Sequence, residues 1–378
     1  MIYADHAATT KISETAKLAM LSAMEKDWYN PSSLYTPGQQ ASGTLMDARV
    51  RIARCLGCLP KEIYFTSGGS EADNQAILSA AAIGKRQGKM HIISTAFEHH
   101  AVLHTLKKLE KEGFEITLLD VGEKGIVSPA QVEKAIRPDT ALVTVMYANN
   151  EIGTIQPIRE IGAVCRQNGV LFHTDAVQAA GHLPINVEED QVDMLSLSAH
   201  KFNGPKGIGV LYAKTGVFLT NLIEGGGQER GKRAGTENLP AIVGMAAALE
   251  EACSLQKERS IYLTKLREQL INGLKKIPGA LLNGDETRRL PGNVNFCFPD
   301  TEAEGLLLLL DNKGICASSG SACTSGFLDP SHVLLAIGRD PQTARGSLRL
   351  TLDYENTPEE VETIIEAVTD TVRILRGC

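Results

Sequence analysis

Apolar runs that alternate with amphipathic helical patterns constrain the fold of this chain more than any other feature. The runs are rich in strand-forming residues, and the segments between them repeat with a helical period. Buried strands joined by such helices predict a mainly parallel sheet covered by helices on both faces. The predicted strands are EIYFTSG (62–68), MHIISTA (90–96), EITLLDV (115–121), ALVTVMYANN (141–150), VLFHTDA (170–176), DMLSLSAH (193–200) and GIGVLYAK (207–214).

The alternation ends after residue 214, and a different organisation follows. A long helical pattern extends from about Pro240 to Gly273, and shorter strand and helix patterns follow it. With 378 residues the chain is long enough for about two domains. We therefore expect a large α/β domain over residues 13–255 and a smaller C-terminal α+β domain over residues 256–378. We expect residues 1–12 to pack on the small domain.

The composition excludes several functional classes. The net charge is −7 and the basic residues are scattered, so no nucleic-acid surface is expected. The longest apolar run, GLLLLLDN (305–312), is far shorter than the roughly 20 residues of a membrane-spanning helix, and the N-terminus lacks the regions of a signal peptide. The eight cysteines are dispersed and form no disulfide framework, so we expect a cytoplasmic protein.

Cys55 and Cys58 form an isolated C-x-x-C pair. A zinc or redox site of this kind needs a second ligand pair or a thioredoxin-like context, and the sequence offers neither. We interpret the two residues as structural cysteines at a helix end.

Three segments carry residue types that suit a phosphate-containing cofactor. In FTSGGSEADN (65–74), two glycines precede Ser70, which with Asp73 has the pattern of a helix N-cap, and a helix N-terminus binds phosphate well. Asp175 ends one predicted strand and suits a cationic ring nitrogen. Lys201 follows the next strand, where a lysine can form a Schiff base.

Each of these segments also has a plain structural interpretation. The first is a capped turn, Asp175 is a helix cap and Lys201 is a surface residue beside a turn. Their combination is what a pyridoxal phosphate (PLP) site requires, because PLP needs a phosphate cup, an acid at its ring nitrogen and a lysine.

At these residues the chain resembles the NifS/IscS-type cysteine desulfurases, which are PLP-dependent enzymes of the aspartate-aminotransferase fold (fold type I). The resemblance runs nearly end to end. It rests on YADHAATT, TSGGSEADN, EHHAV, ANNEIGTIQPI, HTDAVQAAG, SAHKFNGPKGIG, GGGQERGKRAGTEN, SSGSACTSG and SLRLTL, in this order.

The resemblance implies a role for each candidate site residue. Lys201 would carry PLP and act as the base, Asp175 would pair with the ring nitrogen, and His99 would stack on the ring and shuttle protons. Cys323 would accept the sulfur. Gln178 would bind the ring hydroxyl, Asn150 would contact the cofactor or the substrate, and Arg349 would bind the substrate carboxylate. Thr236 would reach the phosphate of the other subunit. The residues that would bind the phosphate within one chain are Gly69, Ser70, Ser198 and His200.

The implied reaction converts L-cysteine to L-alanine and leaves a persulfide on Cys323. A homodimer would pass this sulfur to an acceptor protein such as an iron–sulfur scaffold or a tRNA-thiolation enzyme. No resident metal is expected, and Cys323 would ligate a cluster only when docked to a scaffold.

The segment ASSGSACTSG (317–326) surrounds the implied sulfur acceptor with serine and glycine. These residues predict a flexible loop, which would let Cys323 visit a buried site and then an acceptor. Cys316, in an apolar stretch that we expect to be a strand edge, is the rival nucleophile.

The chain departs from the family pattern at the entrance segment. Tyr29 and Tyr35 replace the glycine and histidine of the usual GNPSSxH, which leaves substrate access and partner choice open. Ser70 stands where the family usually has threonine, and it keeps the hydroxyl.

Two other functions are compatible with parts of this pattern. A selenocysteine lyase or an aminotransferase would use the same fold, and a cysteine on a mobile loop argues against the aminotransferase only. A non-catalytic PLP-binding sensor or scaffold would not need both Lys201 and Cys323, and both are present.

Overall fold

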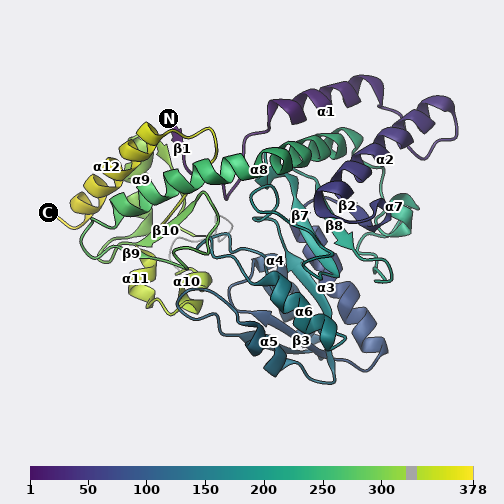
Figure 1. Cartoon of the computed structure of the whole chain (residues 1–378), viewed down its shortest axis with the longest axis horizontal. Helices are drawn as coiled ribbons and strands as arrows, with labels where there is room; N and C mark the ends of the chain where they lie inside the picture. Colours follow the sequence, from purple (N-terminus) through teal and green to yellow (C-terminus); the bar gives the residue numbers. More distant parts are fainter. Residues whose placement is uncertain (321–329, 378) are drawn as a thin grey trace.

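A seven-stranded sheet forms the centre of the computed structural model, which describes residues 1–320 and 330–377 (Figure 1). The strand order is β2-β8-β7-β6-β5-β3-β4. The pairs from β7 to β4 are parallel, and β8 is antiparallel to both of its neighbours. The predicted mainly parallel sheet is confirmed. Its strands are β2 (Ile63–Thr66), β3 (His91–Thr95), β4 (Glu115–Leu119), β5 (Thr140–Thr144), β6 (Leu171–Asp175), β7 (Met194–Ser198) and β8 (Gly209–Ala213).

Helices cover both faces of this sheet, and neighbouring strand residues therefore enter different cores. Ile92 belongs to the core under α3 and α4, whereas Ile93 belongs to the core shared with α2, α6 and α8. This burial on both faces explains why the strands are continuous apolar runs. The helices up to residue 231 are α1 (Glu14–Lys26), α2 (Thr36–Leu56), α3 (Gly69–Arg86), α4 (His100–Lys111), α5 (Pro129–Ala135), α6 (Ile158–Gln167) and α7 (Gln228–Gly231), with 3-10 turns η1 (Pro60–Glu62) and η2 (Ala199–Lys201).

The predicted long helix is α8 (Leu239–Leu274), which runs from the large sheet to the C-terminal region (Figure 1). Ala252 of this helix lies in the core of the large sheet, whereas Leu263 lies in a separate C-terminal core. We therefore propose that the domains divide within α8, near the predicted residue 255. The C-terminal elements are β9 (Leu281–Leu282), β10 (Asn293–Cys297), α9 (Ala303–Asn312), β11 (Ile315–Cys316), α10 (His332–Ala336), α11 (Pro341–Arg345), β12 (Ser347–Thr351) and α12 (Pro358–Leu375).

The N-terminal segment joins both regions. Strand β1 (Ile2–Tyr3) pairs in parallel with β11, and Ala4 lies in the C-terminal core. A few residues later, the carbonyl oxygens of Ala7 and Ala8 contact Lys201 beyond the end of β7. In the described part of the chain, no helix combines the length and the apolar character needed to cross a bilayer.

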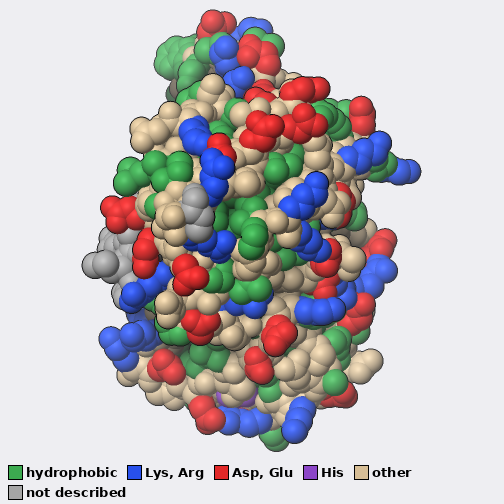
Figure 2. All heavy atoms as spheres, turned by 90° about the vertical axis from the view of Figure 1, so that its left-hand side faces the viewer, with side chains coloured by type: hydrophobic (Ala, Val, Ile, Leu, Met, Phe, Trp, Pro, Cys, Tyr) green, Lys and Arg blue, Asp and Glu red, His purple; other side chains and the backbone are tan. Residues whose placement is uncertain are grey.

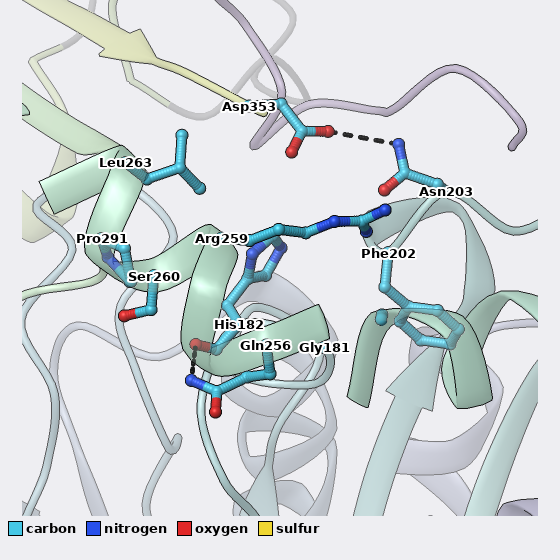
Figure 3. Close-up of a pocket in the computed structure, with 11 residues that line it drawn as sticks. Gly181, His182, Phe202, Asn203, Gln256, Arg259, Ser260, Leu263, Pro291 and Asp353 are labelled. Atoms are coloured by element: carbon cyan, nitrogen blue, oxygen red, sulfur yellow. Dashed lines mark hydrogen bonds between the residues drawn. The ribbon is translucent and has the colours of Figure 1, made fainter. Parts of the chain in front are cut away.

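A small pocket lies at the joint between α8 and the turns around residues 182 and 203 (Figure 3). Its volume is about 10 Å³, which is close to the space of one water molecule. Polar contacts brace the joint: Asn203 Nδ2 donates to Asp353 Oδ2 at 3.2 Å, and Gln256 Nε2 donates to the His182 carbonyl at 3.0 Å. The joint is therefore packed, and it does not offer room for a ligand.

Candidate active site

A cavity of about 230 Å³ lies at the carboxyl ends of β6 and β7, beside the N-terminus of α3. This is the edge of a parallel sheet at which ligands bind in open α/β folds. The predicted residues that line the cavity are Gly69, Ser70, His99, Asn150, Asp175, Gln178, Ser198, His200, Lys201 and Arg349. Thr236 lies elsewhere, and Cys323 lies outside the described residues.

Lys201 ends η2, directly after β7, and its side chain enters the cavity. The Nζ atom donates hydrogen bonds to the carbonyl oxygens of Ala7 at 2.6 Å and of Ala8 at 2.7 Å. Sequence reasoning did not assign these two alanines to the site. The segment YADHAATT was the available signal, but carbonyl groups carry no side-chain signature.

Asp175 is the last residue of β6 and is almost completely buried. Its Oδ1 accepts a hydrogen bond from the Val177 N–H at 2.9 Å. Burial raises the pKa of Asp175 to about 6, and the Val177 hydrogen bond and the nearby Lys201 oppose this rise. Gln178, in the turn that follows, donates from Nε2 to the Ala7 carbonyl at 3.0 Å.

His99 is the N-cap residue of α4, and its Nδ1 accepts the Ala101 N–H at 3.1 Å. Burial, followed by the charge of Lys201, lowers the pKa of His99 to about 4. The ring is therefore neutral at pH 7. Because Nδ1 is an acceptor, the hydrogen-bond network assigns the ring proton to Nε2.

The structure corrects one detail of the expected phosphate cup. The N-cap of α3 is Gly68, so Ser70 is the second residue of the helix, and Asp73 has no capping role. The glycines allow this earlier start because the backbone passes very close to the cavity wall: a Cβ on Gly69 would lie 2.7 Å from Val177 Cγ2. The cup keeps free helix N–H groups and the Ser70 hydroxyl.

Ser198 and His200 complete the same corner of the cavity from the end of β7. His200 Nδ1 lies 3.1 Å from Thr9 Oγ1. Burial, with a smaller effect of Lys201, lowers the pKa of His200 to about 4. The corner therefore presents neutral hydrogen-bonding groups beside a helix N-terminus.

Arg349 lies on β12, and only 2% of its surface is exposed. Its Nη1 donates to the Asn150 carbonyl at 3.0 Å, and its Nη2 donates to Asp5 Oδ1 at 2.8 Å. Its Nε is buried and has no hydrogen-bond partner among the described residues. The guanidinium therefore lines the cavity as a charged group that is already paired with the Asp5 carboxylate.

Thr236 lines a separate pocket together with Ser67 and Glu237. It follows α7, where Glu229 and Arg230 both have positive φ values, 46° and 58°. A buried ion pair from Arg49 to Glu229 braces this strained turn, with Nη2 to Oε1 at 2.6 Å. Thr236 is therefore held away from the cavity of its own chain.

Comparison with known proteins gives one consistent result. The profile of the Aminotransferase class-V family matches residues 2–364. Cysteine desulfurase IscS of Methanosarcina thermophila is 51% identical over 376 residues, which cover 100% of this chain and 93% of that protein. A solved NifS-like protein superposes with a TM-score of 0.92 at 37% identity and 99% coverage of both chains.

A further solved structure, described as SspA in complex with cysteine, has a TM-score of 0.82 at 36% identity. The match covers 94% of this chain and 100% of that one. The family profile spans every residue that lines the cavity. The chain therefore belongs to the class-V aminotransferase family, among the proteins named cysteine desulfurase IscS and NifS-like protein.

Proposed function

We propose that this protein is a PLP-dependent cysteine desulfurase. One observation carries the proposal: Lys201, Asp175 and Arg349 line a single cavity, next to the glycine-rich N-terminus of α3. These groups suit an aldehyde, a ring nitrogen and a carboxylate respectively. The related proteins named cysteine desulfurase support the choice of reaction.

The residues of the cavity fit PLP. The phosphate would lie against the N–H groups of Gly69 and Ser70 and against Ser198 and His200. The ring nitrogen would face Asp175. Gln178 would meet the ring hydroxyl, His99 would lie on the ring face, and Asn150 would contact the cofactor or the substrate.

Bound PLP would supply an electron sink that acidifies the Cα proton of the substrate. Arg349 would orient the substrate by binding its carboxylate. Lys201 Nζ would remove the Cα proton and return a proton as general base and acid. His99 would offer its Nε2–H to the substrate side of the cavity, because Nδ1 is already occupied.

Cys323 would then take the sulfur. Its thiolate attacks the substrate sulfur, an S–S bond forms, and the Cβ–S bond breaks with its electron pair returning to carbon. Protonation of that carbon gives alanine, so atoms and electrons balance without an external oxidant. The solved relative described as in complex with cysteine supports this substrate class.

Replacement of Cys323 tests this reaction directly. We expect Cys323→Ala to bind PLP and cysteine normally, seen as a substrate-induced change in the cofactor absorbance. Alanine release should fall by several orders of magnitude, because the covalent step is removed. Efficient alanine release by this variant would refute the proposal.

We further propose a homodimer in which Thr236 serves the phosphate site of the other subunit. The support is its position outside the cavity of its own chain. Mixed dimers of a Lys201→Ala chain and a Thr236→Val chain test this. If Thr236 acts across the interface, each mixed dimer regains one intact site and activity returns, whereas action within one chain restores none.

We propose that the sulfur acceptor is a protein such as an iron–sulfur scaffold or a tRNA-thiolation enzyme. We also propose the cytoplasm as the location, since the cysteines that the structure describes are free thiols, which suits a reducing compartment. Capture of a partner by persulfide-loaded protein, against a Cys323→Ala control, tests the acceptor.

A further inference from the structure

Asp73 is a buried acid at the cavity that the reaction described above does not use. It lies on α3, one turn after the phosphate cup, and only 1% of its surface is exposed. Its side chain lines the cavity. One carboxyl oxygen each of Asp73 and Asp175 and one ring nitrogen of His99 all lie within 4.8 Å of one another.

The groups around Asp73 compensate a negative charge only in part, through a side-chain hydrogen bond from Ser196. Its Oδ1 has no hydrogen-bond partner in the part of the chain that the structure describes. His173 Nε2 lies 3.6 Å away, but its two nitrogens contact the hydroxyls of Thr144 and Ser196 at 2.8 Å and 3.0 Å. Burial lowers the pKa of His173 to about 3, so this ring is neutral and offers no cation.

The other titratable neighbours decide which acid ionises. Asp175 has the Val177 N–H and the nearby Lys201 to stabilise its anion. Asp73 faces Asp175, whose negative charge destabilises the Asp73 anion, and Glu98 adds to this effect only where it ionises, with its own pKa raised to about 8. Burial, followed by the charge of Asp175, raises the pKa of Asp73 well above its usual range. Two buried carboxyl groups this close together cannot both ionise readily.

We propose that Asp73 keeps its proton at neutral pH and acts as a positioning residue, which leaves Asp175 as the single anion facing the cofactor nitrogen. The inference rests on the proposed function for its cofactor. A neutral Asp73 allows Asp175 to ionise beside Lys201, and it prevents a second negative charge from altering the proton affinity of the ring nitrogen. Asp73 acts through Asp175 and does not itself react.

Asp73→Asn is the decisive variant, because asparagine has the shape of the neutral acid and can keep a donor at the same place. We expect the holoenzyme variant to bind PLP within about threefold of wild type, and the pH midpoint of its cofactor absorbance to move by less than about half a pH unit. Asp175→Asn should weaken PLP binding strongly. A shift of about one unit or more in Asp73→Asn would show that Asp73 is ionised and would overturn the proposal.

Infrared spectroscopy observes the proton directly. Wild-type holoenzyme at neutral pH should show a deuterium-sensitive carbonyl stretch of a protonated carboxylic acid that is lost in Asp73→Asn and retained in Glu98→Gln. Absence of such a band refutes the inference. If Asp73→Asn does not fold, the wild-type band that survives in Glu98→Gln decides the question. Failure of the wild-type protein to bind PLP would instead refute the proposed function, and this result is distinct from the loss of the infrared band.

Discussion

Two buried clusters of charged or titratable groups in this molecule differ in how fully their charges are compensated. Arg49 and Glu229 form a complete ion pair, in which both oxygens of Glu229 accept from the guanidinium and the remaining contacts go to the backbone of β2. Asp73 and Asp175 at the cavity are two acids that face each other, and Asp73 retains an oxygen without a partner among the described residues.

The difference separates stability from chemistry. Removing one partner of a satisfied buried pair leaves an uncompensated charge, which costs stability. Acids that are crowded together reduce stability themselves, but they create the shifted proton affinities that catalysis uses. Substitutions in the first cluster should therefore lower the free energy of unfolding, whereas substitutions of the groups that react at the cavity should lower turnover.

The largest expected effect is at the cavity. Lys201→Ala should abolish turnover, because it removes both the amine that would carry PLP and the proposed Cα base. The free energy of unfolding should change little, although turnover is lost. Alanine release and urea unfolding measure the two quantities.

Lys206→Ala is the control for Lys201, since this exposed lysine lies five residues later, in the loop that leads to β8. It should retain turnover. Alanine release by Lys201→Ala at a near wild-type rate would break the comparison, because the cavity would then not carry the chemistry.

Arg49→Met should have the largest effect on stability. It leaves Glu229 buried and unpaired, which we expect to lower the free energy of unfolding by about 3–5 kcal/mol. Urea unfolding at fixed protein and PLP concentrations measures the change. Arg54→Met is the matched control in the same helix, because the Arg54 side chain is 74% exposed. The control should change stability by less than about 0.5 kcal/mol, and an equal loss in both variants would contradict the prediction.

A pH-dependent effect should be intermediate. Glu98 is fully buried, and burial raises its pKa to about 8 against hydrogen bonds from the Met146 N–H and the Thr95 hydroxyl. A raised pKa in the folded state means that the contribution to stability is present below the unfolded pKa and is lost as pH rises through about 8. Between about pH 5 and about pH 9, the free energy of unfolding of wild type should therefore fall by a few kcal/mol relative to that of Glu98→Gln.

Thermal or urea unfolding across this pH range checks the Glu98 prediction. Glutamine preserves the acceptor oxygen for both hydrogen bonds and cannot ionise. If the stability of wild type and of Glu98→Gln changes in parallel with pH, the pKa of Glu98 is not raised. The difference between the ion-paired cluster and the cluster of acids would then be smaller than expected.

The smallest expected effect is at Cys316. This residue ends β11, away from the cavity lining, as the predicted strand edge required. Cys316→Ala should change turnover by less than about twofold and stability by less than about 0.5 kcal/mol. Mass spectrometry after incubation with cysteine should find the persulfide on Cys323. A persulfide on Cys316 would reverse the assignment.

The sequence by itself determined the family, the central sheet and the long helix. The runs from residue 62 to residue 214 became β2 to β8, and the pattern at 240–273 became α8, because hydrophobic period and strand propensity act over short stretches of chain. Lys201 and Asp175 were identifiable because each follows directly from a predicted strand whose carboxyl end faces ligands.

Only the tertiary structure decided which groups share the cavity. Ala7 and Ala8 reach Lys201, and Asp5 reaches Arg349, across separations of more than 190 residues that no local pattern records. The pattern around Ser70 placed the N-cap of α3 two residues too late, because the glycines allow the helix to begin at Gly69, whose backbone lies close to Val177. The sequence pattern predicted that Asp73 takes part in the N-cap of a helix. Only the packing of α3 against β6 places its carboxyl group beside Asp175.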